Sequence, residues 1–228
     1  MSAIAGNLQA VFNRIANACE RSGRAPESVR LLAVSKTWPA PAVLEAAAAG
    51  QRAFGENYAQ EGVAKMDATR PLQLEWHFIG PLQSNKTRAV AEHFAWVHSI
   101  DRLKIAERLS AQRPAGLPPL QACVQVNVSG EASKSGCHPD EAPSLCRAVA
   151  ALPNLRLRGL MAIPEAADDE AAQRAPFRRL RQLGDELRAA GLALDTLSMG
   201  MSHDLEAAVA EGATIVRIGT AIFGNRNP

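Results

Sequence analysis

Hydrophobic residues recur along the chain in two alternating patterns, which predict strands and helices in turn. Short apolar runs rich in β-branched residues are followed by segments in which apolar residues lie three and four positions apart. The first pattern predicts strands over residues 29–37, 53–57, 75–80, 96–101, 120–128, 155–163, 196–201 and 214–223. The second predicts helices over residues 3–21, 39–49, 58–69, 85–93, 102–113, 139–151, 168–190 and 203–211.

The order of these elements predicts the fold class. A leading helix followed by strand–helix units with short connections favours an α/β fold, a closed (β/α)8 TIM-type barrel with an extra N-terminal helix. A doubly wound open sheet is the alternative, but its glycine fingerprint G-x-G-x-x-G is absent. Because no composition break divides the 228 residues, we expect a single domain over residues 1–228.

Composition excludes several classes of function. A net charge of +2 and an aromatic content of 4% supply neither a basic patch nor a stacking platform, so no nucleic-acid partner is expected. No apolar window approaches a membrane span, and polar residues interrupt the N-terminus, so we expect neither a membrane segment nor a signal peptide. The cysteines lack CxxC or disulfide-framework spacing, which favours free thiols in a cytoplasmic protein, and no metal site is expected.

The first predicted strand ends in a lysine. Strict alternation places Lys36 on the same face as Leu32 and Val34, at the carboxyl end of the strand. A buried ammonium costs free energy unless it is paired, solvated or used in chemistry, and desolvation lowers its pKa. Such a lysine suits Schiff-base formation, whereas the alternative is a strand-end lysine whose amino group reaches water.

The last two units contain a candidate phosphate site, because barrels commonly bind phosphate at the loops after strands seven and eight. Ser202 adds a hydroxyl donor at the start of a predicted helix, whose N-terminus favours an anion. Gly219 and Thr220 are small enough to let a phosphate approach the backbone. The alternative for Ser202 is an ordinary helix N-cap.

Closure of the barrel would bring these loops beside Lys36, because strand eight then pairs with strand one. Ile215, Arg217 and Gly219 share one face of strand eight. An inward Arg217 would therefore reach a ring held between Lys36 and the phosphate loops. A lysine one small ring away from a phosphate site suits pyridoxal 5′-phosphate (PLP). The alternative for Arg217 is an outward side chain in a surface salt bridge.

Seven segments carry a family resemblance over nearly the whole chain, in order. They are LLAVSKTWPA, FGENYAQE, WHFIGPLQSNK, VHSID, VNVSGEASKSG, RGLMAI and LSMGMSHDLEAAVAEGATIVRIGTAIFG. Together they closely resemble the pyridoxal phosphate homeostasis proteins, whose fold is similar to the N-terminal barrel of bacterial alanine racemase. One departure is Trp38, since the family often has a second lysine at this position.

The resemblance implies six cofactor-binding residues: Lys36, Asn57, Ser202, Arg217, Gly219 and Thr220. Lys36 would hold PLP as an internal aldimine, and Arg217 would face the pyridine nitrogen. Ser202 and the backbone amides of Gly219 and Thr220 would hold the phosphate, with Asn57 lining the pocket. His77 and Met161 are expected nearby, and Lys134 is expected to be solvated, a transient secondary cofactor site being its alternative.

The residues favour a carrier over an enzyme. An arginine at the pyridine nitrogen disfavours its protonation, which weakens the ring as an electron sink. Racemases of this type also use a tyrosine from an additional domain as second base, whereas the only tyrosine here is Tyr58. We therefore expect a monomeric, non-catalytic protein that buffers PLP or delivers it to apo PLP-dependent enzymes.

Two other functions remain open at this point. The first is a small PLP-dependent racemase or decarboxylase that pairs Lys36 with a histidine as second base, the candidates being His77, His98 and His203. The second is a Schiff-base aldolase whose phosphate loops hold a sugar phosphate without any cofactor.

Overall fold

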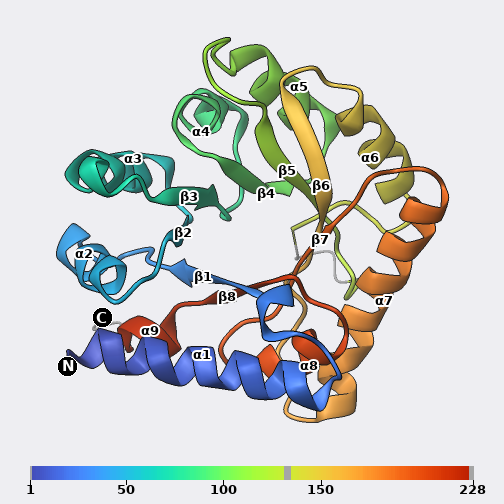
Figure 1. The fold of residues 1–228 in the computed structure, drawn as a ribbon. Coiled ribbons are helices and arrows are strands. Elements are labelled where there is room, and N and C mark those ends of the chain that lie inside the picture. Colours follow the sequence, from blue (N-terminus) through green and yellow to red (C-terminus); the bar gives the residue numbers. More distant parts are fainter. Residues whose placement is uncertain (1, 131–134, 226–228) are drawn as a thin grey trace.

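The computed structural model describes residues 2–130 and 135–225, and its strands form a closed parallel barrel surrounded by helices (Figure 1). The strands pair in sequence order, and β1 closes the barrel against β8. They are β1 (Arg30–Val34), β2 (Ala53–Glu56), β3 (Glu75–Phe78), β4 (Trp96–Ile100), β5 (Leu120–Gln125), β6 (Leu155–Met161), β7 (Thr196–Ser198) and β8 (Ile215–Ile218). This confirms the predicted (β/α)8 barrel.

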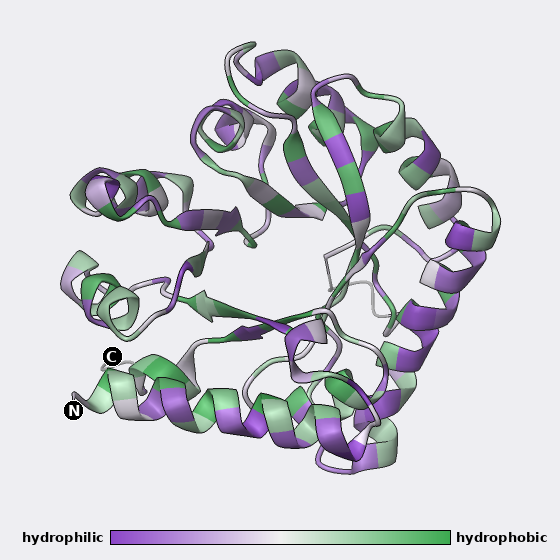
Figure 2. Cartoon of the chain, viewed as in Figure 1, coloured by the Kyte–Doolittle hydropathy of each residue, from purple (hydrophilic) through white to green (hydrophobic). Residues whose placement is uncertain are grey.

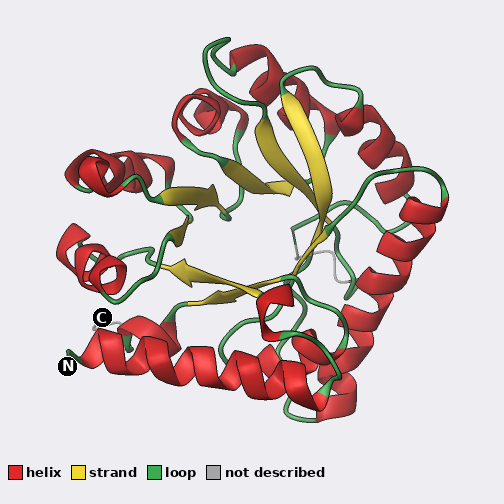
Figure 3. Ribbon diagram, viewed as in Figure 1, coloured by secondary structure: helices red, strands yellow, loops and turns green. Residues whose placement is uncertain are grey.

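Helices connect successive strands on the outside of the barrel (Figure 3). They are α1 (Ala3–Arg21), α2 (Ala40–Ala48), α3 (Ala59–Ala68), α4 (Thr87–His93), α5 (Leu103–Gln112), α6 (Ala142–Ala150), α7 (Glu170–Ala189), α8 (Leu205–Ala210) and α9 (Thr220–Phe223). The extra N-terminal helix is α1, which lies along α8 and α9 at the edge of the barrel (Figure 1). In the described part of the chain, no helix combines the length and the apolar composition needed to cross a bilayer.

The predicted strands were too long at their carboxyl ends. The strand predicted over 29–37 ends at Val34, and the one predicted over 214–223 ends at Ile218 and gives way to helix α9. Ile222 and Phe223 are buried in that helix, and apolar residues of a short buried helix look the same in sequence as those of a buried strand. Lys36 therefore lies in a turn beyond β1 and not within the strand.

Alternation along β1 and β8 separates the inside of the barrel from the helix-covered outside. Leu32 packs inside the barrel with Ile215, whereas Val216 and Ile218 belong to the core beneath the helices. Leu32 is also the register partner of Arg217, whose buried side chain hydrogen-bonds atoms of β7 and of the loop after β6. The inward orientation predicted for Arg217 is therefore confirmed. Figure 2 shows hydrophobic and hydrophilic residues interspersed along the helices, and hydrophobic ones such as Val43 of α2 and Leu180 of α7 are buried.

Candidate functional site at the carboxyl ends of the strands

A tight turn carries Lys36. The N–H of Trp38 donates to the carbonyl of Ser35 at 3.0 Å, so Lys36 and Thr37 form the centre of a four-residue turn. Thr37 has a φ of 67°, a conformation that is costly for a β-branched residue. Because alternation ends with the strand at Val34, parity does not orient Lys36, which is half-buried in the turn.

A buried ionic cluster of Glu56, Glu61 and Lys65 lies against this turn. Lys65 Nζ donates to Glu56 Oε1 at 2.7 Å and to Glu61 Oε1 at 2.6 Å. The same ammonium donates to the Ser35 carbonyl at 2.6 Å, and Glu61 Oε1 accepts the Thr37 N–H at 2.6 Å. Burial raises the pKa of Glu56, although hydrogen bonds from Lys65 and Ser35 oppose this shift. The backbone is thus anchored on both sides of Lys36.

Arg217 is a buried cation on the inner face of β8. Its Nη1 donates to Ser198 Oγ at 2.8 Å, and its Nη2 donates to the carbonyl of Ala162 at 2.9 Å. Among residues 2–130 and 135–225 this guanidinium forms no salt bridge, and burial lowers its pKa to about 10, although the more distant charge of Asp204 opposes the shift. A cation bound only to neutral oxygens retains the capacity to attract an electron-rich ligand.

A chain of polar side chains, here called the interior chain, continues from Arg217 through the barrel. Ser198 Oγ lies 2.8 Å from His98 Nδ1, and His98 Nε2 lies 2.8 Å from His77 Nδ1. His77 Nε2 is 2.5 Å from Glu75 Oε1, whose partner Arg30 lies at the amino end of β1. The interior chain therefore links the partly exposed amino end of the barrel to Arg217.

Charge distribution sets the direction of these hydrogen bonds. Burial lowers the pKa of His77, and burial together with the positive charges around it lowers the pKa of His98 well below its usual value. Burial would raise the pKa of Glu75, but His77 and Arg30 outweigh it and lower that pKa. With Glu75 ionised and both imidazoles neutral, His77 donates to Glu75, His98 donates to His77 and Ser198 donates to His98. Three neutral side chains, those of Ser198, His98 and His77, thus separate the Glu75 carboxylate from Arg217.

The two predicted phosphate loops meet beside β1. The N–H of Arg217 donates to the carbonyl of Gly200 at 2.9 Å, which joins the loop after β7 to β8. A Cβ at Gly219 would lie 3.1 Å from the carbonyl oxygen of Val34, so the end of β8 approaches the end of β1. Thr220 begins α9 immediately afterwards. The structure therefore brings Gly219 and Thr220 close to the segment of Lys36.

Ser202 lies in the loop after β7, but it does not cap helix α8. The N-cap position belongs to Asp204, whose Oδ1 accepts the N–H of Met201 at 2.5 Å. The Ser202 hydroxyl has no hydrogen-bond partner among the residues that the structure describes, whereas its carbonyl accepts two hydrogen bonds from Arg14 at 3.1 Å. Helix α1 thus fixes this loop and leaves the hydroxyl available.

Helix α1 also contacts the second phosphate loop. Asn7 Nδ2 donates to the carbonyl of Ile222 in α9 at 2.9 Å, and Arg14 forms an ion pair with Glu206 of α8 at 2.9 Å. The N-terminal helix therefore holds the ends of both loops. Sequence reasoning identified α1 only by its amphipathic spacing and assigned no role to its polar residues.

The structure places two of the remaining predicted residues, Asn57 and Met161, in different surroundings, and it does not describe Lys134. Asn57 lines a hollow of about 260 Å³ with Tyr58, Phe78 and Lys86, between the loops after β2 and β3. Met161 is fully buried inside the barrel. Lys134 lies outside the described residues, and the contact of Asn57 with the cofactor stays a prediction.

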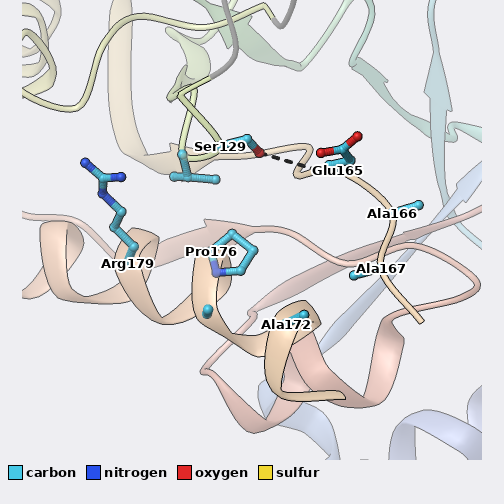
Figure 4. Close-up of a pocket in the computed structure, with 9 residues that line it drawn as sticks. Ser129, Glu165, Ala166, Ala167, Ala172, Pro176 and Arg179 are labelled. Carbon is cyan, nitrogen blue, oxygen red and sulfur yellow. Dashed lines mark hydrogen bonds between the residues drawn. The ribbon is translucent and has the colours of Figure 1, made fainter. Parts of the chain in front are cut away.

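A second hollow, of about 370 Å³, lies between the loops after β5 and β6 and helix α7 (Figure 4). Ser129, Glu165 and Arg179 line it, and the Ser129 hydroxyl accepts the N–H of Glu165 at 3.4 Å. None of the six predicted cofactor-binding residues lines this hollow. In the described segments, no group of three or more His, Cys, Asp or Glu residues is placed to hold a metal ion.

The closed barrel, with a lysine just after the first strand and an arginine on the last, defines the class of the protein. The family model described as the N-terminal domain of alanine racemase matches residues 6–227.

Comparison with known proteins gives the family. The pyridoxal phosphate homeostasis protein of Pseudomonas aeruginosa is 66% identical over 227 residues, which is 100% of this chain and 97% of that protein. The protein of the same name from Escherichia coli K12 is 56% identical, covering 100% and 98%. PipY of Synechococcus elongatus with PLP bound is 41% identical with a TM-score of 0.84, covering 97% and 100%. The chain belongs to the pyridoxal phosphate homeostasis protein family, which confirms the resemblance found in the sequence.

Sequence reasoning missed the residues that support the site. Lys65 follows Ala59 and Gly62 at helical spacing on the buried face of α3, which is a readable signal, but the sequence pattern was used only to predict a helix over residues 58–69. His98 was considered as a base and not as a link to Arg217. Ser198 gave no signal, because a serine at a strand end has no pattern of its own.

Proposed function

We propose that this protein binds PLP at the carboxyl ends of β1, β7 and β8 and buffers or delivers it in the cytoplasm, without robust amino-acid turnover. The relatives named above support the cofactor: two are named for pyridoxal phosphate homeostasis, and PipY has PLP bound. The four cysteines are buried free thiols, which suits a reducing compartment.

The single observation that carries the proposal is the buried cation of Arg217, which forms no salt bridge with the residues that the structure describes. Arg217 is 4% exposed, and its guanidinium donates to the hydroxyl of Ser198 and the carbonyl of Ala162. A pyridine nitrogen with a lone pair fits such a cation, and the cation in turn opposes protonation of that nitrogen. The residues present therefore fit the cofactor.

The phosphate end fits as well. The hydroxyl of Ser202 has no partner among the described residues, and Gly219 approaches Val34 closely just before α9. Backbone amides and a hydroxyl are ordinary phosphate ligands, and a side chain at Gly219 would narrow the space. We assign phosphate binding to Ser202 and to the backbone amides of Gly219 and Thr220.

Lys36 supplies the covalent attachment in this proposal. When its amine adds to the aldehyde carbon, a C=N bond forms and the aldehyde oxygen leaves as water, so no oxidant or other reactant is required. The cofactor when bound supplies an electron-withdrawing ring. The remaining roles belong to the protein: Arg217 keeps the ring nitrogen unprotonated, and the phosphate loops orient the ring.

The placement of the other ionisable groups supports a carrier. His77 and His98 have both ring nitrogens engaged in the interior chain, so neither offers a free base. Tyr58 is 60% exposed in the outer hollow, and His203 lies 3.2 Å from Asp204. Proton transfer in a racemase needs a second base positioned against the substrate carbon.

The test compares Lys36→Ala with Lys104→Ala, which removes an exposed lysine from α5. We expect the purified wild-type protein and K104A to show the visible absorbance of a PLP imine after reconstitution, and K36A to lack it. A wild-type protein that cannot be reconstituted, or a K36A variant that keeps the band, contradicts the proposal. Exchange of the α-hydrogen of amino acids well above the rate of free PLP contradicts the non-catalytic part.

Delivery is tested separately. The loaded protein is mixed with an apo PLP-dependent enzyme and an excess of a trap for free aldehyde, and enzyme activation is measured. Activation that survives the trap supports direct transfer between the two proteins, whereas activation that the trap abolishes supports buffering of free PLP. Light scattering during the same experiment tests the expected monomer.

A further inference from the structure

We propose that Glu56, Glu61 and Lys65 are positioning residues that hold the turn of Lys36 in a left-handed backbone conformation and so fix where its amine is presented. This inference rests on the proposed function, because it assigns a role in cofactor binding to residues that do not themselves contact the cofactor.

The turn is not stable through its own sequence. Thr37 occupies the third position of the turn with a φ of 67°, where glycine or asparagine is usual. In residues 2–130 and 135–225, Gln73 is the only other non-glycine residue with a positive φ, and it is not β-branched. A β-branched residue persists in this conformation only when its surroundings impose it.

The ionic cluster imposes that conformation through the backbone. Glu61 Oε1 accepts the N–H of Thr37 at 2.6 Å, directly after Lys36. Lys65 Nζ donates to the carbonyl of Ser35 at 2.6 Å, directly before Lys36. The Ser35 hydroxyl donates to Glu56 Oε1 at 2.6 Å. The peptide groups on both sides of Lys36 are thus fixed by charged partners, which form the stronger hydrogen bonds.

Helix α3 is built to deliver this cluster. A Cβ at Gly62 would lie 2.6 Å from Phe94 Cζ, so glycine allows the helix to approach the barrel closely. Lys65, one turn further on, is 5% exposed, and Glu56 on β2 is fully buried. Buried ionic groups contribute little net stability compared with apolar residues of similar size. Positioning of the adjacent turn therefore accounts for the cluster better than stability does.

The experiment is a double-mutant cycle on Glu61→Ala and Thr37→Gly. The Glu61 side chain is 27% exposed, so E61A is expected to fold. Titration of each variant with PLP, followed by imine absorbance, should show affinity about tenfold weaker for E61A, because one charge-assisted hydrogen bond is lost. T37G should restore E61A to within about twofold of wild type, because glycine adopts a positive φ without the cluster.

The matched control is Glu92→Ala, which removes a half-exposed glutamate paired with Arg88 at the same helical spacing as Glu61 and Lys65. E92A should bind PLP like the wild type. Glu61→Gln, which keeps an acceptor oxygen for the Thr37 N–H but loses the charge, should bind PLP with an affinity between those of the wild type and E61A.

The outcomes separate this inference from the proposed function. If K36A loses the imine but E61A binds like the wild type, the positioning role is wrong and the cofactor assignment stands. If E61A is weak and T37G fails to restore it, the cluster acts on something other than the turn, which also overturns the inference. If K36A keeps the imine, the cofactor assignment fails first.

Discussion

The two sides of the candidate site are supported in opposite ways. Beneath Lys36, the support is ionic and compact: Lys65 lies between two carboxylates and binds the backbone directly. Beneath Arg217, the support is a line of neutral groups, and the carboxylate that ends it, Glu75, is paired at the far end with Arg30. Both supports are largely buried, but only the first places opposite charges in direct contact next to the residue that it supports, because Glu75 and Arg30 pair at the far end of the second.

The difference fits the roles that the proposed function gives each residue. In that proposal Lys36 has to be held in place, and charged partners on the neighbouring peptide groups hold a backbone tightly. Arg217 has to stay available to the cofactor, and a carboxylate in direct contact would neutralise it. Neutral imidazoles orient the guanidinium through Ser198 without satisfying its charge. A backbone that must be rigid and a guanidinium that must keep its charge available therefore need different supporting groups.

The largest expected effect comes from breaking the ionic support. Lys65→Met leaves Glu56 buried without a cation and should lower the free energy of unfolding by about 3 kcal/mol. The double variant Glu56→Leu/Lys65→Met leaves no buried charge and should recover at least half of that loss. Urea unfolding of the three proteins measures both values.

Lys104→Met provides the control, because Lys104 is exposed on α5 and its replacement should change stability by less than about 0.5 kcal/mol. A double variant less stable than K65M would mean that the charges stabilise the fold themselves, and the contrast between the two supports would then be wrong.

An intermediate effect is expected from pH. The pKa values of His77 and His98 are lowered by burial, so below about pH 6.5 the unfolded chain binds protons that the folded chain does not. Stability should therefore fall as pH falls from 7 towards 5, by at most about 1.4 kcal/mol per pH unit for each histidine. Replacing His98 with Gln should make this slope shallower.

Glu56 should make stability depend on pH in the opposite direction to the two histidines. Burial raises its pKa in the folded protein, so the folded state holds a proton that the unfolded state releases, and stability is lost as pH rises through that interval. Glu56→Gln should remove this contribution and steepen the net fall on the acid side. Urea unfolding between pH 4 and pH 8 tests both signs, and an unchanged slope in the His98→Gln variant would contradict the neutral state of the interior chain.

The smallest effect is expected at the phosphate loops. Arg14 pairs with Glu206 and binds the Ser202 carbonyl from a partly exposed position, so Arg14→Met should lower stability by less than about 1 kcal/mol. PLP affinity should fall by about two- to threefold, because the loop after β7 is then less fixed. Arg88→Met, which breaks a comparable exposed pair on α4, should leave affinity unchanged. Equal affinity in both variants would show that α1 does not support the phosphate loops.

The order of elements could be predicted because it depends on local patterns. Alternation between short apolar runs and helical spacing is a property of neighbouring residues, and eight such units with short connections leave few topologies. The inward face of Arg217 followed from counting along β8. The end of β1 could not be predicted in the same way, because the turn of Thr37 depends on Glu61, which lies 24 residues further along the chain.

The sequence by itself determined the barrel and the family, since periodicity and motif order record these directly, and it predicted the residues that we propose to face the cofactor. Only the tertiary structure decided how those residues are supported. Lys65 reaches the Ser35 carbonyl across 30 residues, and His98 reaches Ser198 across 100. A buried polar group is stable only beside a matching partner, and which partner it meets depends on closure of the barrel and not on its neighbours in sequence.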